Sequence, residues 1–233
     1  MKIGFFDYLI NFLFPKICIV SDLRLDDENS NQFIDDKILN TIEKTNVNDL
    51  ASLKYNLKSD ISFSLFRFYE DADIQTVVHH FKYNGMKKLA YFMGSYMCKQ
   101  LTENKYGFDI REFDIISPIA LYKTKFRERS YNQSDYLSRG INSNLNIKYI
   151  PDLLVRIKNT KTQTHLTRKE REENLSNAFI INEKYSATIE GKKIIIIDDV
   201  VTSGSTLNEA IKELKKTNVS KICALTLAMA VEK

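Results

Sequence analysis

The stretch from Ile194 to Thr206 constrains the fold of this chain more than any other part of the sequence. Four consecutive isoleucines precede two adjacent carboxylates, Asp198 and Asp199, and a loop of small hydroxyl residues with one glycine follows. An unbroken run of β-branched residues is typical of a strand that is buried on both faces of a parallel sheet. The strand therefore delivers two carboxylates to its C-terminal end, where open α/β sheets bind their ligands.

The loop after these carboxylates has the chemistry of a phosphate-binding site. Gly204 lets the backbone approach a ligand, and a helix that begins near Leu207 adds unpaired N–H groups and the positive end of its dipole. The carboxylates can accept hydrogen bonds from the vicinal hydroxyls of a sugar, so a phosphorylated sugar fits both halves. Two acidic residues before a capping hydroxyl also occur in ordinary α/β proteins, so each half alone is weak evidence for a ligand site. Only the complete stretch from Ile194 to Thr206 is a specific signal for a phosphorylated sugar. The hydroxyl donors are Thr202, Ser203, Ser205 and Thr206.

Strands and helices alternate over most of the chain after residue 73. This alternation predicts an α/β fold, with a mostly parallel sheet and helices on both of its faces. Neither the G-x-x-x-x-G-K-[ST] loop nor the G-x-G-x-x-G fingerprint of nucleotide-binding proteins occurs in the sequence. The predicted strands are 114–118, 146–150, 193–197 and 221–228, and the predicted helices are 74–83, 89–101, 132–140 (ending at Gly140) and 207–214.

The sequence divides into an N-terminal segment, residues 1–72, and a main domain, residues 73–233. Residues 22–60 are polar and acidic without Gly or Pro, which indicates short helices or irregular structure. Apolar residues between Ile3 and Leu13 lie close to helical spacing and predict an amphipathic helix packed on the protein, with attachment to a membrane surface as the alternative. This stretch is shorter than the ~20 apolar residues of a membrane span, so no span is expected.

Composition excludes several classes of protein. The chain has 233 residues, of which 43% are hydrophobic, so it can bury a core and is not a disordered protein. Its three cysteines, Cys18, Cys98 and Cys223, are far apart and odd in number, and they form neither a disulfide framework nor a CxxC pair. A reducing, cytoplasmic location is therefore expected.

The Ile194–Thr206 stretch resembles the phosphoribosyl-pyrophosphate (PRPP) motif of type I phosphoribosyltransferases. Further segments resemble the ComF family of competence proteins, in an order that is hard to obtain by chance. The resemblance covers essentially the whole chain, most securely residues 74–230. The matching segments are 81–85 for the FKYxG element, 117–121 for VPVPL, 127–133 for RxRGYNQ, and Gln163-Thr164, Arg171, Asn174-Leu175 and Ala178-Phe179 for the segment QT…R…NL…AF.

This resemblance implies how the chain would bind PRPP. Asp198 and Asp199 would hold the ribose 2′- and 3′-hydroxyls as the catalytic pair, and the following loop would hold the 5′-phosphate. Mg²⁺ would be carried on the pyrophosphate and ribose oxygens, without protein side chains as ligands. The residues implied in PRPP binding are Asp198, Asp199, Val200, Val201, Thr202, Ser203, Gly204, Ser205 and Thr206.

The sequence departs from the family in two places. ComF proteins usually begin with a zinc ribbon, but here only Cys18 remains, with Ser21 at its partner position and no second pair. Structural zinc needs four nitrogen or sulfur ligands, so the N-terminal segment is expected to be a degenerate zinc-ribbon-like appendage without zinc. The loop after the predicted strand 114–118 also differs from the family pattern. Ala120 replaces the second proline, residues 122–123 replace a His-Pro pair, and Ser130 replaces the glycine of RxRGYNQ. These changes bear on catalysis more than on binding, and they leave transferase activity open.

The small net charge of +4 conceals a basic segment. Between residues 115 and 171 the chain has twelve Lys and Arg but four Asp and Glu. Such a cluster suits pyrophosphate or a nucleic-acid backbone, and a solvated loop without a partner is the alternative. The candidate pyrophosphate partners are Lys123, Arg127 and Arg129, and the interleaved aromatic residues that could stack on bases are Tyr122, Phe126 and Tyr131.

Three functions follow from these features. The resemblance implies a PRPP- and Mg²⁺-binding protein of natural competence, which handles incoming single-stranded DNA in the cytoplasm together with competence-machinery proteins. The second is an active phosphoribosyltransferase that uses an unidentified acceptor and releases pyrophosphate. The third is a sensor that binds PRPP without turnover.

Overall fold

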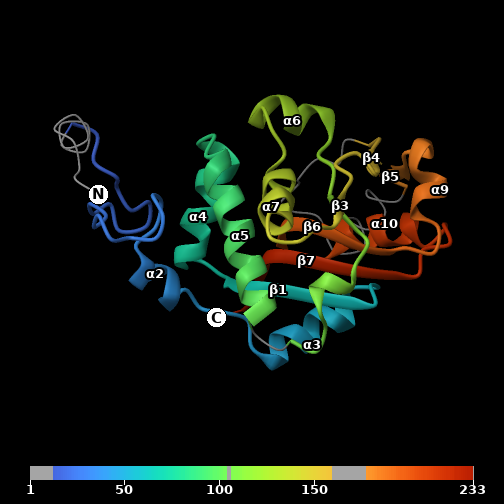
Figure 1. Cartoon of the computed structure of the whole chain (residues 1–233), viewed down its shortest axis with the longest axis horizontal. Coiled ribbons are helices and arrows are strands. Elements are labelled where there is room, and N and C mark those ends of the chain that lie inside the picture. The colour runs from blue at the N-terminus through green and yellow to red at the C-terminus, as the bar shows by residue number, and fades with distance from the viewer. Residues whose placement is uncertain (1–12, 104–105, 159–176, 233) are drawn as a thin grey trace.

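A computed structural model describes residues 13–103, 106–158 and 177–232 of the chain (Figure 1). Five strands form one sheet in the order β1-β7-β6-β2-β3, and every neighbouring pair is parallel. The predicted α/β fold with a mostly parallel sheet is therefore confirmed. The strands are β1 (Ile61–Phe68), β2 (Ile115–Pro118), β3 (Lys148–Tyr149), β6 (Lys193–Val201) and β7 (Lys221–Ala230).

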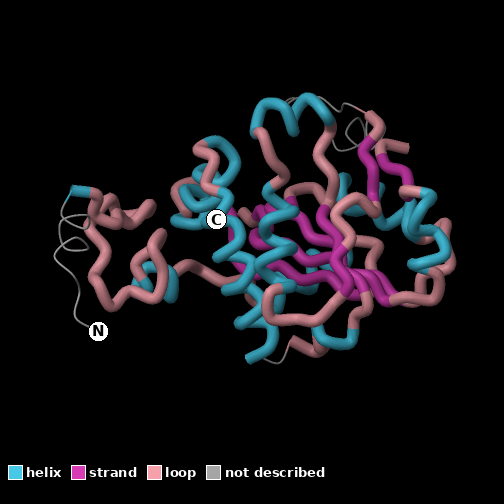
Figure 2. The backbone as a smooth tube through the Cα atoms, turned by 45° about the horizontal axis from the view of Figure 1, so that its top comes forward, coloured by secondary structure: helices cyan, strands magenta, loops and turns pink. Residues whose placement is uncertain are grey.

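Helices cover both faces of this sheet, as the sequence predicts (Figure 2). On one face, apolar side chains of α4, α5 and α7 share a buried cluster with Ile195 and Ile197. On the other face, α3 and α10 pack with Ile194 and Ile196. The helices are α2 (Asp36–Thr41), α3 (Val47–Asn56), α4 (Asp73–Tyr83), α5 (Lys87–Glu103), α6 (Lys123–Arg129), α7 (Gln133–Asn142), α9 (Ser186–Ile189) and α10 (Ser205–Leu214).

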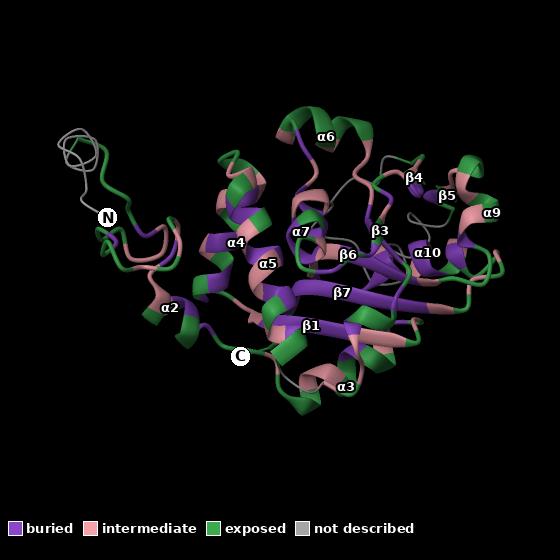
Figure 3. Ribbon diagram, viewed as in Figure 1, coloured by how far each residue is buried: buried purple, intermediate pink, exposed green. Residues whose placement is uncertain are grey.

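Strand β6 lies in the middle of the sheet, and its four isoleucines are fully buried (Figure 3). Because successive side chains of a strand point to opposite faces, the four isoleucines supply both clusters. The strand is longer than the predicted 193–197: it continues to Val201 and includes both aspartates. The reason is its neighbour β7, whose pairing continues from Asp198 opposite Thr226 to Val201 opposite Met229.

Gly140 does not end its helix, contrary to the prediction, because α7 continues to Asn142. A Cβ at Gly140 would overlap the carbonyl oxygen of Tyr91, and one at Gly94 would overlap that of Leu137. Glycine is therefore required here so that α5 and α7 can approach backbone to backbone. This contact fixes the position of α7 against the sheet.

The segment before residue 73 contributes to the sheet. Strand β1, which the sequence pattern does not predict, pairs in parallel with β7 from Ile61 opposite Cys223 to Phe68 opposite Ala230. The boundary proposed between residues 72 and 73 therefore falls after an edge strand of the main sheet. The sequence pattern missed this strand because its buried positions, Phe63 to Phe66, are consecutive and do not alternate with exposed ones.

Residues 13–42 form the small lobe at the left of Figure 1. Its Cys18, Ile34 and Leu39 are buried and belong to the same apolar cluster as α4 and α5. The helix predicted near the N-terminus falls largely on residues 1–12, which lie outside the described residues. Within the described ranges, no helix combines the length and apolar content that a membrane crossing requires.

Strands β4 (Leu154–Arg156) and β5 (Phe179–Ile181) form a separate antiparallel pair beside α9 (Figure 1). The family-like segment from Gln163 to Asn174 lies outside the described residues. Its last part, Ala178-Phe179, begins β5 and is buried.

Candidate phosphoribosyl-binding site

The candidate site lies at the carboxyl edge of the sheet. The strands β1, β2, β6 and β7 are mutually parallel, so their carboxyl ends share one edge. Helices α4, α6 and α10 follow β1, β2 and β6 directly in the chain, and they begin near this edge. Such an edge is where open α/β sheets bind ligands.

Asp198 is held by a helix that sequence reasoning did not connect with it. Its Oδ1 accepts a hydrogen bond of 3.0 Å from the Ser134 hydroxyl and one of 2.9 Å from the backbone N–H of Asp199. Ser134 lies in the first turn of α7. Burial, and next the negative charge of Asp199, raise the pKa of Asp198 to about 6, against the opposing effect of these hydrogen bonds and of Lys82.

Asp199 is 8% exposed and pairs with a lysine. Its Oδ2 lies 3.1 Å from Nζ of Lys82, and its Oδ1 accepts a hydrogen bond of 2.7 Å from the N–H of Val200. Lys82 comes from the last turn of α4, within the FKYNG segment. Both carboxylate oxygens of Asp199 are therefore engaged in this structure.

The loop from Thr202 to Gly204 joins β6 to α10. Gly204 precedes α10 in the left-handed conformation, with φ of 74°, a conformation that favours glycine. The hydroxyls of Ser203 and Ser205 lie 2.9 Å apart. Ser205 and Thr206 stand in the first turn of the helix, where its N–H groups lack intrahelical partners.

The N-terminal segment braces this loop. Asn208 in α10 donates a hydrogen bond of 2.9 Å to the carbonyl of Asn56 and accepts one of 2.9 Å from the N–H of Lys58. A Cβ at Gly204 would lie 2.7 Å from Cδ2 of Leu57. Residues at and just after the end of α3 therefore hold in place the first turn of α10 and the loop that precedes it.

Positive charge surrounds the two carboxylates. Burial lowers the pKa of Lys125 in α6, and the charges of Arg156, Arg129 and Lys82 lower it further, whereas Asp199 raises it. Burial also lowers the pKa of Arg156 in β4, against the attraction of Asp198. Lys125 and Arg156 thus lie within electrostatic range of the aspartates.

The predicted basic residues have unequal positions. Lys123 and Arg127 are exposed on α6, and Arg129 is half-buried with its guanidinium 5.5 Å from the centre of the Tyr83 ring. The structure adds Lys82, Ser134, Lys125 and Arg156 to the candidate residues. Lys82 and Ser134 stand in or next to the family-like segments, which could have indicated them, whereas no sequence signal marks Arg156.

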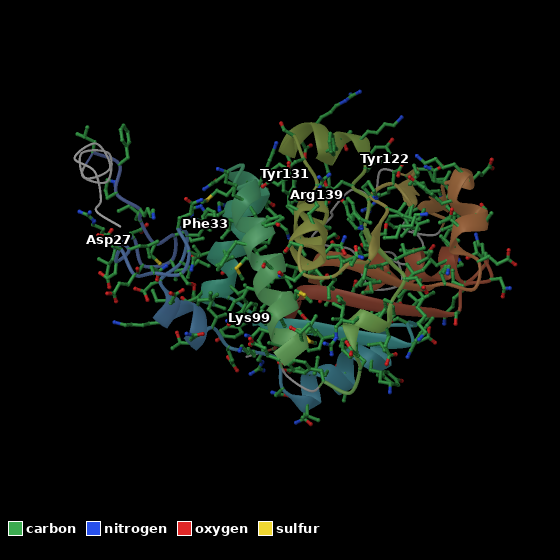
Figure 4. All side chains as sticks on the ribbon, viewed as in Figure 1. Asp27, Phe33, Lys99, Tyr122, Tyr131 and Arg139 are labelled. Atoms are coloured by element: carbon green, nitrogen blue, oxygen red, sulfur yellow. The ribbon has the colours of Figure 1, made fainter. Side chains whose placement is uncertain are left out.

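The prediction that Tyr131 can stack on bases is wrong. Tyr131 is 4% exposed, and its hydroxyl donates to the carbonyl oxygen of Phe81. Figure 4 shows Tyr122 and Tyr131 at opposite ends of α6, with Tyr131 facing the body of the protein. Phe126 is 49% exposed, so it can still offer a ring face to a ligand.

The part of the chain that the structure describes contains no cluster of metal-binding side chains. Among the described residues, no three His, Cys, Asp or Glu side chains lie close enough together to hold a metal ion. Two adjacent carboxylates beside a phosphate-type loop nevertheless suit Mg²⁺ that arrives with a phosphorylated ligand, because Mg²⁺ takes most of its ligands from substrate and water.

Comparisons with known proteins agree with this architecture. The phosphoribosyl transferase domain family matches residues 136–233. Competence protein F of Haemophilus influenzae is 38% identical over 117 residues, which cover 50% of this chain and 51% of that protein. The DNA utilization protein YhgH of Salmonella typhimurium is 26% identical over 149 residues, 64% of each chain.

Competence protein ComFC of Bacillus subtilis is 31% identical over 114 residues, which cover 48% of this chain and 43% of that protein. The chain thus spans about half the length of the relatives that match it at above 30% identity. The chain is therefore similar to competence proteins and to DNA utilization proteins, and its residues 136–233 match the phosphoribosyl transferase domain family.

Proposed function

We propose that the chain binds PRPP, as its Mg²⁺ complex, at the carboxyl edge of the sheet. One observation carries the proposal: Asp198 and Asp199 at the end of β6 stand directly before a hydroxyl-rich loop and the N-terminus of α10. Ribose hydroxyls need acceptors and a phosphate needs donors, and this segment offers both within nine residues.

Each part of the ligand has a matching part of the site. Asp198 and Asp199 accept hydrogen bonds from the ribose hydroxyls, and the loop from Thr202 to Thr206 donates to the 5′-phosphate. The cations Lys82, Lys125, Arg129 and Arg156 face the pyrophosphate, whose charge is partly neutralised by the Mg²⁺ that it carries. Lys123 and Arg127 contribute a more distant attraction from their exposed positions on α6.

Calorimetric titration tests this proposal. Mg²⁺·PRPP is titrated into the wild type and into Asp198→Asn/Asp199→Asn, with thermal unfolding as a check that the variant is folded. Binding by the wild type that the double variant loses supports the site. Equal binding by both proteins, or none by a folded wild type, would overturn it.

Whether binding leads to turnover is a separate question. In the transferase alternative, an acceptor nucleophile forms a bond to ribose C1 while the bond from C1 to the pyrophosphate oxygen breaks, and pyrophosphate leaves with the bonding electrons. The cations near Asp198 would stabilise that leaving group. In the sensor alternative, the ligand binds and stays intact. Pyrophosphate release in the same samples, with candidate acceptors added, distinguishes the two.

We further propose that the protein serves natural competence by handling incoming single-stranded DNA in the cytoplasm, together with other competence proteins. Two relatives carry the names competence protein and DNA utilization protein. The structural support is α6, where the basic residues Lys123 and Arg127 are exposed beside the half-exposed ring of Phe126. Basic side chains next to an open aromatic ring suit a single strand.

Fluorescence anisotropy with a labelled oligothymidylate tests the DNA role. We expect affinity to fall steeply as salt rises, because phosphate contacts release counterions. Lys123→Gln/Arg127→Gln should reduce that salt dependence, and Phe126→Ala should weaken binding at every salt concentration. Affinity that does not depend on salt, or variants that bind like the wild type, would contradict the role.

A further inference from the structure

Lys82 occupies one of the two carboxylates that the proposed ligand needs. Its Nζ lies 3.1 Å from Oδ2 of Asp199, and the side chains of the two residues are 20% and 11% exposed. The other oxygen of Asp199 already accepts from the Val200 N–H. A ribose hydroxyl that approaches Asp199 therefore competes with the ammonium of Lys82.

The surroundings favour a second anion near this lysine. Burial lowers the pKa of Lys125, and the charges of Arg156, Arg129 and Lys82 lower it further, against the carboxylate of Asp199. Like charges repel one another, and an anion among them relieves the repulsion. A pyrophosphate group provides several such charges and strong acceptor oxygens.

Lysine is suited to change partners in such a setting. Its ammonium is a compact charge on a flexible four-carbon chain, and it has no fixed bidentate geometry to maintain. Asp199 would not be left without partners after Lys82 moves, because the ribose hydroxyls would then donate to it. Both charges remain compensated throughout, so no isolated buried charge is created.

Resting on the proposed function, we propose that Lys82 exchanges its partner when ligand binds. Without ligand, Lys82 pairs with Asp199 and keeps that carboxylate occupied. With PRPP, its ammonium moves to the pyrophosphate, and Asp199 becomes free to accept the ribose hydroxyl. Lys82 then acts as a specificity residue: it favours ligands that bring a pyrophosphate over phosphorylated sugars that lack one.

The test compares two ligands, Mg²⁺·PRPP and ribose 5-phosphate with Mg²⁺, by calorimetry on the wild type and on Lys82→Met. We expect the variant to bind PRPP about 10- to 100-fold more weakly, as for the loss of one charged hydrogen bond. Its affinity for ribose 5-phosphate should be unchanged or higher, because the competitor for Asp199 is gone. Lys88→Met, at an exposed position of α5, is the matched control and should bind both ligands like the wild type.

Two further results would overturn the exchange. If Lys82→Met weakens both ligands equally, Lys82 only positions Asp199; if it changes neither, Lys82 has no part in binding. Lys82→Arg should retain the preference for PRPP, and it serves as the folded comparison should Lys82→Met unfold. A wild type that binds neither ligand would refute the proposed function itself, and the exchange with it.

Discussion

Ser134 donates a hydrogen bond of 3.0 Å from its hydroxyl to Oδ1 of Asp198, across 64 residues of sequence. The bond connects the first turn of α7 to the end of β6. It lowers the pKa of Asp198, which burial and Asp199 raise. Ser134 thus helps to keep the carboxyl group of Asp198 in its ionised form.

Removing the Ser134 hydroxyl should lower the affinity for PRPP, and the loss should be largest at mildly acidic pH. In Ser134→Ala the pKa of Asp198 rises further, so the carboxylate is lost at a higher pH than in the wild type. Calorimetry with Mg²⁺·PRPP is carried out as the pH is lowered from 8 to 5.5. The affinity of the variant should begin to fall at a higher pH than the affinity of the wild type. Ser138→Ala is the control one turn later, because its hydroxyl donates to the carbonyl of Ser134 and not to Asp198. Identical pH profiles for Ser134→Ala and wild type would contradict the expectation.

Asp198 should make the fold more stable as the pH falls. Its pKa is about 6 in the folded protein and near the ordinary 3.8 in the unfolded chain, so the folded state binds the proton more strongly. The resulting stability is fully present below about pH 4 and is lost as the pH rises through 6. We expect the free energy of unfolding of the wild type, relative to Asp198→Asn, to fall by about 1 to 3 kcal/mol between those limits. Urea unfolding at several pH values measures it.

A carboxylate with the opposite shift provides the comparison for this experiment. Burial acts to raise the pKa of Asp152, but hydrogen bonds from Lys184 and Tyr185 leave it below its ordinary value. Its contribution to stability should therefore be lost as the pH falls below about 4. If Asp198→Asn and Asp152→Asn show the same slope with pH, the reasoning for Asp198 is refuted.

Gly204→Ala should destabilise the protein more than Gly191→Ala. Both glycines have positive φ, 74° and 67°, at which alanine costs about 1 to 2 kcal/mol. Only at Gly204 would the new Cβ also approach Leu57, whereas nothing lies within 4 Å at Gly191. Urea unfolding should show the larger loss for Gly204→Ala, and Leu57→Ala in the same chain should recover part of it. Equal losses of stability for the two variants would contradict this expectation, because they would mean that the Leu57 side chain moves aside at no cost in stability.

Gly140→Ala should disrupt both the fold and the site. The added methyl group overlaps the backbone of Tyr91, which cannot move without separating α5 from α7. We expect a loss of about 3 kcal/mol or more, together with weaker PRPP binding because α7 carries Ser134. Lys99→Ala, at an exposed position of α5, is the control and should keep both properties. Unchanged urea unfolding of Gly140→Ala would show that the helices are not in tight contact.

The N-terminal lobe should not depend on zinc. The sulfur of Cys18 accepts a hydrogen bond of 3.4 Å from the N–H of Asp35, and the Asn31 side chain accepts from Phe33 and Ile34. These hydrogen bonds connect the turns of the lobe to one another. A strong chelator should leave the thermal unfolding temperature unchanged, because no metal bonds are lost. Zinc found in the purified protein and a lower unfolding temperature after chelation would contradict this.

Local patterns along the chain are enough to predict the class of fold and the position of the central motif. A run of four isoleucines is typical of a strand that is buried on both faces of a sheet, and the residues after it have chemistry that suits a phosphorylated sugar. Both are local properties of one segment, so neighbours along the chain reveal them. The same holds for the end of the helix predicted over 74–83, because α4 ends at Tyr83.

The residues that meet Asp198 and Asp199 become known only from how the whole domain packs. Lys82 and Ser134 approach from two different helices, and Arg156 from a separate pair of strands, at separations that no periodicity encodes. Gly140 is not a helix end because it is needed for contact with Tyr91 in α5, a helix far away in the sequence. Long-range contacts arise from packing of the whole domain, and packing cannot be deduced from the pattern of any one segment.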